Sequence, residues 1–181
     1  KLLKILNRLK NPTLITDDKV QERLMSFIES NDEHTDLIDS IENSVIVIES
    51  SQNGQIYTSR EEDIAFIQYS SGSTSEPKGI TLTHKNLVTN ISAIAKGLNL
   101  TSSDIGISWM PLTHDMGLIG THMTLFSCGL SQIIMDTDLF IKKPLMWLQQ
   151  TSKYRASILT SPNFGYKHLL KIHERRPLKD I

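Results

Sequence analysis

The feature that most constrains the fold is an alternation of short apolar runs with segments of helical periodicity. The apolar runs are VIVIE (45–49), IAFIQYS (64–70), an alternating Ile105, Ile107 and Trp109, QIIMD (132–136) and ASILTSP (156–162). The first two are continuous enough to predict buried strands. Strands that alternate with helices favour a parallel sheet, because a parallel connection must cross over the sheet. We therefore predict an α/β fold with a mostly parallel sheet flanked by helices.

The helices are predicted from apolar spacing and from end signals. Asp17-Asp18 and Thr83 are suited to N-caps, and Pro144 to the first turn of a helix. A short strand is predicted at 13–16, whereas 31–43 is acidic and irregular. The predicted helical segments are 1–10, 19–30, 84–98, 116–130, a segment that opens at Pro144, and 163–174.

A loop rich in hydroxyl groups follows the strand predicted at 64–70. Its sequence is SSGSTSEPKG (70–79). Glycine permits positive φ, so successive backbone N–H groups can turn inward and bind an anion, while Ser and Thr hydroxyls add donors. Lys78 adds a positive charge. The loop therefore predicts a phosphate cradle, and the alternative is an ordinary polar surface loop.

The loop does not fit the P-loop pattern GxxxxGK[ST], because Pro77 stands where the second glycine is required. It resembles the phosphate loop of the adenylate-forming superfamily, [ST]-S-G-[ST]-T-G-x-P-K-G, with Ser75 in place of a glycine. The resemblance implies that the loop binds the β- and γ-phosphates of ATP together with Mg²⁺. The residues implied are Ser71, Gly72, Ser73, Thr74, Ser75, Lys78 and Gly79.

A second polar segment, SWMPLTHDMGLIG (108–120), lies between two apolar segments at a strand-to-helix junction. A neutral histidine at His114 could donate a hydrogen bond to a carboxylate or phosphate oxygen, and a helix N-terminus nearby favours an anion. Alternatively, Asp115 caps the helix and His114 satisfies a buried carbonyl. A metal site is not predicted, because one His-Asp pair supplies too few ligands.

This segment resembles W-L-P-L-x-H-D-M-G-L-I-G of the fatty acyl-AMP ligases, a branch of the same superfamily. PLMWLQQTSKYRAS (144–157) and LTSPNFGY (159–166) resemble two further patterns of that branch, with Thr160-Ser161 in place of two glycines. The resemblance implies two catalytic residues, His114 beside the reacting carboxylate and Lys78. It also implies an acyl pocket formed by His114, Asp115, Met116, Gly117, Asn163 and Phe164. For Trp147 and Tyr154 we predict core packing.

The motifs of the resemblance lie within 66–166. The adenine segment Y-G-x-[ST]-E, the ribose segment T-G-D, the hinge and the C-terminal catalytic lysine of the family have no counterpart here. We therefore expect 1–181 to be a fragment of a single N-terminal adenylation domain. Within it we distinguish an α/β portion (1–49), a connection (50–62), and the phosphate-loop and acyl-pocket portion (63–181).

The resemblance implies a ligase that uses ATP to convert a fatty acid into an acyl-adenylate, for transfer to a carrier protein of a polyketide or peptide synthase. The alternatives are a fatty acyl-CoA synthetase, an amino-acid adenylation domain, which the His114 segment argues against, and a non-catalytic nucleotide-binding or interaction module. The isolated fragment is expected to be inactive.

Composition excludes several other classes. The net charge of -1 argues against nucleic acid as a partner. The segment 116–130 is too short and too polar to span a bilayer, so no integral membrane segment is expected. Cys128 is the single cysteine, which excludes an internal disulfide and fits a reducing compartment, so we expect the cytoplasm.

Overall fold

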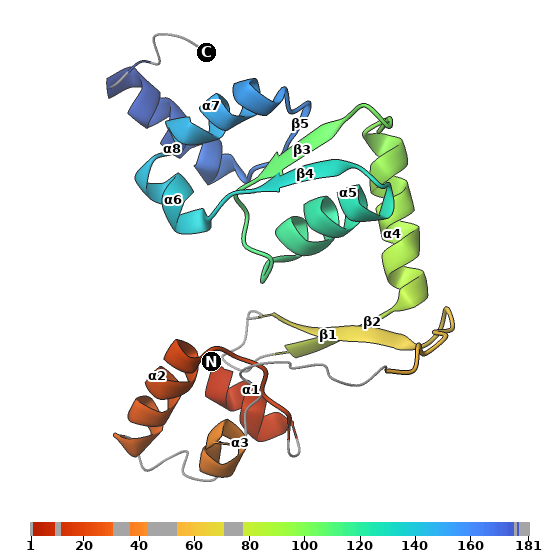
Figure 1. The fold of residues 1–181 in the computed structure, drawn as a ribbon, viewed down its shortest axis with the longest axis vertical. Coiled ribbons are helices and arrows are strands. Elements are labelled where there is room, and N and C mark those ends of the chain that lie inside the picture. The colour runs from red at the N-terminus through yellow and green to blue at the C-terminus, as the bar shows by residue number, and fades with distance from the viewer. Residues whose placement is uncertain are drawn as a thin grey trace. The chain divides into compact units, whose positions relative to one another are not determined.

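A computed structural model describes residues 2–9, 12–30, 37–42, 54–70, 78–175 and 177. Contacts divide the chain into two compact units, Lys1–His84 and Lys85–Ile181, and each is described by itself. Figure 1 shows the elements of both units in chain order. The strand predicted at 45–49 lies outside the described residues.

Three helices form the start of the first unit: α1 (Leu2–Arg8), α2 (Asp18–Glu29) and α3 (Ile38–Glu42). Asp17 caps α2, since its Oδ1 accepts the Val20 N–H at 2.8 Å. The helices share an apolar core made of Leu3, Leu6, Ile28, Leu37 and Ile41. Helix α3 was not predicted, because its acidic stretch has too few apolar residues to show a period. No strand forms at 13–16, where Ile15 makes only an isolated bridge.

Strands β1 (Ile64–Ser70) and β2 (Lys78–Thr83) pair antiparallel, with Tyr69 opposite Gly79 and Ser70 opposite Lys78. The prediction of a strand at 64–70 is confirmed. The prediction that it is buried is wrong, since Ile64 is 60% and Ile67 is 45% exposed. In the described part of the chain β1 pairs with β2 alone, and the two strands form a two-stranded sheet.

The second unit contains a parallel sheet, which confirms the predicted α/β class. Its strands are β3 (Ile105–Ser108), β4 (Ser131–Ile134) and β5 (Ile158–Leu159), in the order β4-β3-β5. Ile107 pairs with Ile133 on one side and with Leu159 on the other. The central strand β3 is thereby held on both edges, and its residues 106–108 are buried.

Helices precede, connect and follow these strands (Figure 1). They are α4 (His84–Gly97), the π-helix η2 (Met116–Met123), α5 (Thr124–Ser127), α6 (Thr137–Lys142), α7 (Leu145–Tyr154) and α8 (Asn163–Arg175). The predicted helices at 84–98, from Pro144 and at 163–174 are confirmed. Helix α6 was not predicted; Asp136 caps it by accepting the Leu139 N–H.

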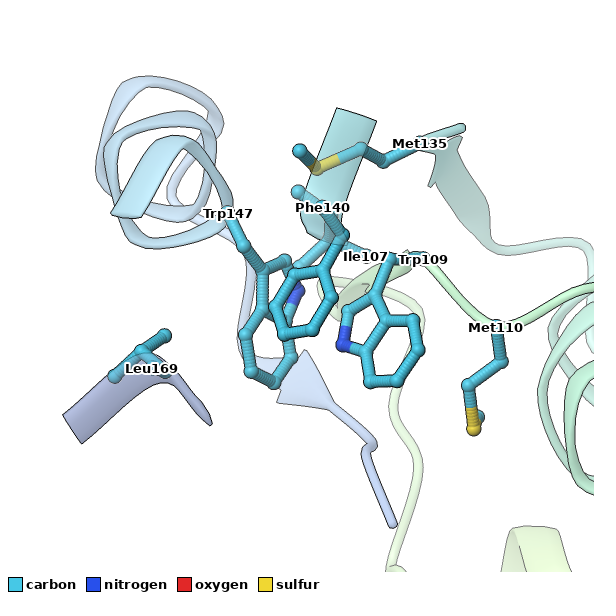
Figure 2. Packing of buried hydrophobic residues seen from close by; sticks show 7 residues of the cluster. All are labelled: Ile107, Trp109, Met110, Met135, Phe140, Trp147 and Leu169. Carbon is cyan, nitrogen blue, oxygen red and sulfur yellow. The ribbon is translucent and has the colours of Figure 1, made fainter. Parts of the chain in front are cut away.

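The core of the second unit is aromatic, and Figure 2 shows Phe140 between the indoles of Trp109 and Trp147. Trp109 and Phe140 stack with 3.9 Å between ring centroids, and Trp147 meets Phe140 edge-on at 5.7 Å. Core packing is confirmed for Trp147, which is 1% exposed. Core packing is wrong for Tyr154, which is the last residue of α7 and is 44% exposed. Within the described ranges, no helix combines the length and the apolar character needed to cross a membrane.

Candidate functional site

The segments that carry the predicted acyl pocket follow two neighbouring strands of the parallel sheet. Residues 114–117 come after β3, and Asn163 and Phe164 come after β5. Because β3 and β5 are parallel neighbours, both segments leave the sheet at its carboxyl edge. In open α/β sheets ligands bind in the crevice outside this edge. The fold therefore brings both parts of the predicted pocket to one edge of one sheet.

His114 and Asp115 form a close pair at the start of η2. The Nδ1 atom of His114 lies 2.8 Å from Oδ1 of Asp115, and both side chains are more than half exposed. The same Oδ1 accepts the N–H of Met116 at 2.8 Å, so Asp115 caps η2. This confirms the reading of Asp115 as a helix cap. His114 does not satisfy a buried carbonyl, since its side chain is 61% exposed.

The two ring nitrogens of His114 have different surroundings. Nδ1 accepts the N–H of Met116 at 3.2 Å and also lies 2.8 Å from Oδ1 of Asp115. A neutral imidazole that accepts at Nδ1 carries its proton on Nε2, which can then donate a hydrogen bond. The role of a neutral His114 as a donor stays a prediction.

The π-helix η2 fixes Met116 and Gly117 just after this pair. A β-carbon at position 117 would collide with the carbonyl oxygen of Pro111, so a glycine is needed for this close backbone approach. Leu118 N donates to His114 O at 2.8 Å, which holds the backbone of His114 in the first turn. Met116 is 41% exposed, whereas Gly117 is buried. The predicted pocket residues thus differ: Met116 can touch a ligand with its side chain, and Gly117 shapes the backbone.

The segment after β5 forms the second part of the site. Phe164 is 63% exposed, and its ring meets the buried Trp109 edge-on, with 5.8 Å between centroids. Asn163, the first residue of α8, is exposed. A β-carbon at position 165 would collide with Oγ of Ser161, so Gly165 allows α8 to start close to the loop. The Phe164 ring therefore packs against the buried Trp109 and is still exposed enough to contact an apolar ligand.

Two hydroxyls join the two segments. Thr121 of η2 and Thr160 of the loop after β5 lie 2.9 Å apart, oxygen to oxygen. Thr121 is 3% exposed. Sequence reasoning gave neither residue a role, although Thr160 stood out as a departure from glycine. No sequence signal could identify Thr121, since its partner is 39 residues away.

The predicted phosphate loop lies between β1 and β2. Ser71, Gly72, Ser73, Thr74 and Ser75 lie outside the described residues. Lys78 and Gly79 are described: they open β2, with Lys78 paired to the last residue of β1. A β-carbon at position 79 would lie 3.0 Å from Cγ2 of Ile67 and 3.2 Å from Cε1 of Tyr69, so glycine fits tightly beneath these side chains. The antiparallel pair therefore frames the loop, with Lys78 at its end.

Shifted pKa values occur in two turns outside these segments. Asp63 accepts the Arg60 backbone N–H and the Tyr57 hydroxyl, and these bonds lower the pKa of Asp63. The Asp63 carboxylate raises the pKa of Tyr57. The Ser157 hydroxyl and the Thr101 N–H lower the pKa of Asp104, which lies just before β3 at the amino edge of the sheet. Both carboxylates brace a turn, which is a structural task.

No group of three or more His, Cys, Asp or Glu side chains in the described part of the chain could hold a metal ion. A shallow hollow of about 360 Å³ is lined by Val20, Arg23, Leu24 and Phe27 of α2 in the first unit. It contains none of the predicted site residues.

Known proteins are similar to this chain in sequence. The family described as AMP-binding enzyme matches residues 1–180. A putative acyl-CoA synthetase from Caulobacter vibrioides is 43% identical over 107 residues, which is 59% of this chain and 19% of that protein. The medium-chain-fatty-acid–[acyl-carrier-protein] ligase JamA from Moorena producens is 41% identical over 122 residues, which is 67% of this chain and 20% of that protein.

A solved structure is also similar to this chain. The fatty acid AMP ligase from Legionella pneumophila superposes with a TM-score of 0.64 at 39% sequence identity, over 68% of this chain and 22% of that chain. The matched region spans about a fifth of the length of the relatives.

Proposed function

Because the chain belongs to the AMP-binding enzyme family, we propose that the protein activates fatty acids with ATP. The carboxylate oxygen of the acid attacks the α-phosphorus of ATP, a P–O bond forms, and the bond to the β-phosphate breaks. The products are an acyl-adenylate and pyrophosphate. The carboxylate is itself the nucleophile, so the protein needs to supply position and charge neutralisation, not an activated serine or cysteine.

One observation carries this proposal. The segments 114–117 and 163–164 both lie at the carboxyl edge of the parallel sheet, and each exposes a side chain suited to an acyl-adenylate. His114 is polar and can face the carboxylate, and Phe164 is apolar and can face the acyl chain. The similarity of the same region to the fatty acid AMP ligase from Legionella pneumophila supports a fatty acid as the substrate.

We assign the phosphates of ATP to the loop between β1 and β2. Lys78 would neutralise charge on the departing pyrophosphate, and Gly79 lets the chain pass beneath Tyr69. The other residues of the proposed phosphate site are Ser71, Gly72, Ser73, Thr74 and Ser75.

We assign the acid to the carboxyl edge of the sheet. His114 would orient the carboxylate through Nε2, because Nδ1 accepts the Met116 N–H and lies beside Asp115. Met116, Gly117, Asn163 and Phe164 would line the pocket beside it.

Mg²⁺ is proposed to enter with ATP. The described residues do not form a metal site of their own, and Mg²⁺ commonly binds substrate phosphates while it keeps several waters. Its role would be to neutralise phosphate charge. No protein ligand is assigned to it.

Two fates of the acyl-adenylate are considered. Similarity to JamA, whose name gives an acyl carrier protein as the acceptor, supports transfer to a carrier protein. Similarity to a putative acyl-CoA synthetase supports coenzyme A as the acceptor in a second candidate function. The cytoplasm is the proposed location, on the ground that the sequence has a single cysteine.

The test is pyrophosphate exchange by the natural full-length protein, with fatty acids of several lengths and with amino acids. We expect exchange that depends on a fatty acid, without acyl-CoA when coenzyme A is added. Acyl-CoA formation would select the second candidate. Exchange with amino acids alone, or with no acid, would reject fatty-acid activation.

A further inference from the structure

We propose that Thr160 is a positioning residue, whose hydroxyl holds the start of η2 in register with the loop after β5. The inference rests on the proposed function, because the two segments it joins are those assigned to the acid and the acyl chain. The resembled pattern has glycine at this position, and glycine cannot make the bond. The coupling is therefore a property of this chain's own residues.

The direction of the hydrogen bonds follows from counting hydrogens. The hydroxyl of Thr121 donates to the carbonyl oxygen of Met116 at 3.1 Å. A hydroxyl has one hydrogen, so Thr121 can only accept in its 2.9 Å contact with Thr160. Thr160 must therefore donate. A chain of two hydrogen bonds runs from Thr160 through Thr121 to Met116.

These two hydrogen bonds end at the backbone of the first turn of η2, next to His114. The N–H of Met116 is bonded to Asp115, and the carbonyl of His114 accepts the N–H of Leu118. The carbonyl of Met116 also belongs to the first turn, and the Thr121 hydroxyl donates to it. The first turn of η2 is thus fixed on one side by Asp115 and on the other by the two threonines.

The burial of Thr121 protects its hydrogen bond with Thr160 from exchange with water. Thr121 is 3% exposed, so water does not replace Thr160 as its donor at low cost. At the other end, Thr160 directly follows β5, which pairs with the buried strand β3. Three and four residues further along are Asn163 and Phe164, both exposed. A shift of η2 would therefore move His114 relative to Phe164, and small misplacements of catalytic groups lower rates strongly.

The experiment compares Thr160→Val, which keeps the shape and removes the hydroxyl, with Thr160→Ser, which keeps the hydroxyl. Thr151→Val is the matched control. Its hydroxyl also donates to a backbone carbonyl, that of Trp147 in α7 at 2.8 Å, but joins no second element. The rate of pyrophosphate exchange and the KM values for fatty acid and ATP are measured in the natural full-length protein. Amide hydrogen exchange at 114–121 is measured alongside.

We expect Thr160→Val to lower kcat about three- to tenfold, as the loss of one neutral hydrogen bond would. The KM for ATP should stay unchanged, and amide exchange at 114–121 should become faster. Thr160→Ser should restore both readouts, and Thr151→Val should match the wild type in both. Adding Thr121→Val to Thr160→Val should cost less than the sum of the two single effects, because both remove the same bond.

Wild-type kcat and amide exchange in Thr160→Val would overturn the inference, as would lower stability with no change in kcat. Failure of the proposed function looks different: the wild type itself would then show no fatty-acid-dependent exchange. In that case Thr160 has no catalytic task, and amide exchange alone decides whether it holds η2.

Discussion

At the scale of single residues, His114 and Asp115 both contact the first N–H of η2. Oδ1 of Asp115 accepts the Met116 N–H at 2.8 Å and lies 2.8 Å from Nδ1 of His114, so one carboxylate oxygen caps the helix and contacts the ring. The sequence HD could not reveal this double task, because it depends on the χ angles of both side chains. Lys78 differs, since its position at the end of the loop follows from the strand pairing.

Replacement of Lys78 by alanine in the natural full-length protein should lower the rate of pyrophosphate exchange by about 10²–10³, the usual cost of removing one group that stabilises transition-state charge. The matched control is Lys171→Ala, since Lys171 is an exposed residue of α8 outside the proposed site. It should leave the rate unchanged. An unchanged rate in Lys78→Ala would remove Lys78 from the mechanism.

At the scale of elements, the end of each helix shows how much the local sequence controls. Helices α4, α5 and α7 are each followed by a residue of positive φ, which is Asn99, Gly129 and Arg155 respectively. In each case the N–H of this residue and the N–H of the next residue donate to carbonyls of the last helical turn. This is the Schellman arrangement, which favours glycine. Gly97 is the last residue of α4 and lies two residues before the position with positive φ. Glycine occupies this position only in α5, and arginine is strained there.

The strain predicts a stabilising substitution. Arg155→Gly should raise the free energy of unfolding by about 0.5–1 kcal/mol, because glycine avoids the steric cost of positive φ and loses part of that gain to its freer unfolded chain. Gly129→Ala is the inverse change and should lower it by about 1 kcal/mol, since no atom crowds position 129 and only the backbone is affected. Urea unfolding measures both. A destabilising Arg155→Gly would mean that the arginine side chain contributes more than its strain costs.

The π-helix gives a second comparison at this scale. Gly117→Ala should push η2 away from the Pro111 carbonyl and lower the rate of pyrophosphate exchange about tenfold or more. Gly120→Ala should have little effect, because a β-carbon there would meet only Cγ of Met116 at 3.8 Å. Circular dichroism should show both variants folded. Equal rates for the two variants would show that the close approach at Gly117 is not needed.

At the scale of the whole molecule, the parallel sheet organises the second unit. Its carboxyl edge carries the candidate site, and its amino edge is braced by Asp104, whose Oδ1 accepts the Ser157 hydroxyl at 2.6 Å across 53 positions of the chain. The predicted family and the α/β class are confirmed. The division into portions at 49 and 62 and the roles of the site residues stay predictions.

The brace predicts a dependence of stability on pH. The pKa of Asp104 is lower in the folded chain than in the unfolded chain. Its contribution is therefore fully present above the unfolded pKa of about 3.9 and is lost as the pH falls through the folded value. Asp104→Asn should flatten the change in urea midpoint between about pH 5 and pH 2. Ser157→Ala removes the largest cause of the shift and should flatten it partly. Parallel curves for wild type and Asp104→Asn would show that the unfolded pKa is not higher.

The sequence determined those features that neighbours in the chain decide. Apolar runs predicted strands at 64–70, 105–109 and 132–136, which overlap β1, β3 and β4, and the cap signal at Asp17-Asp18 predicted the start of α2. Motifs with fixed spacing gave the family. Each of these signals is formed by residues that are close together in the sequence.

Tertiary structure alone decided the rest. Strand β2 exists because β1 supplies its hydrogen bonds, and α3 because Leu37 and Ile41 find an apolar core. The segment 116–123 is wound as a π-helix with Gly117 packed against the Pro111 carbonyl and Thr121 bonded to Met116 five residues earlier. Thr121 and Thr160 meet only after β5 has joined β3. Such contacts connect residues far apart in the chain, and no local pattern records them.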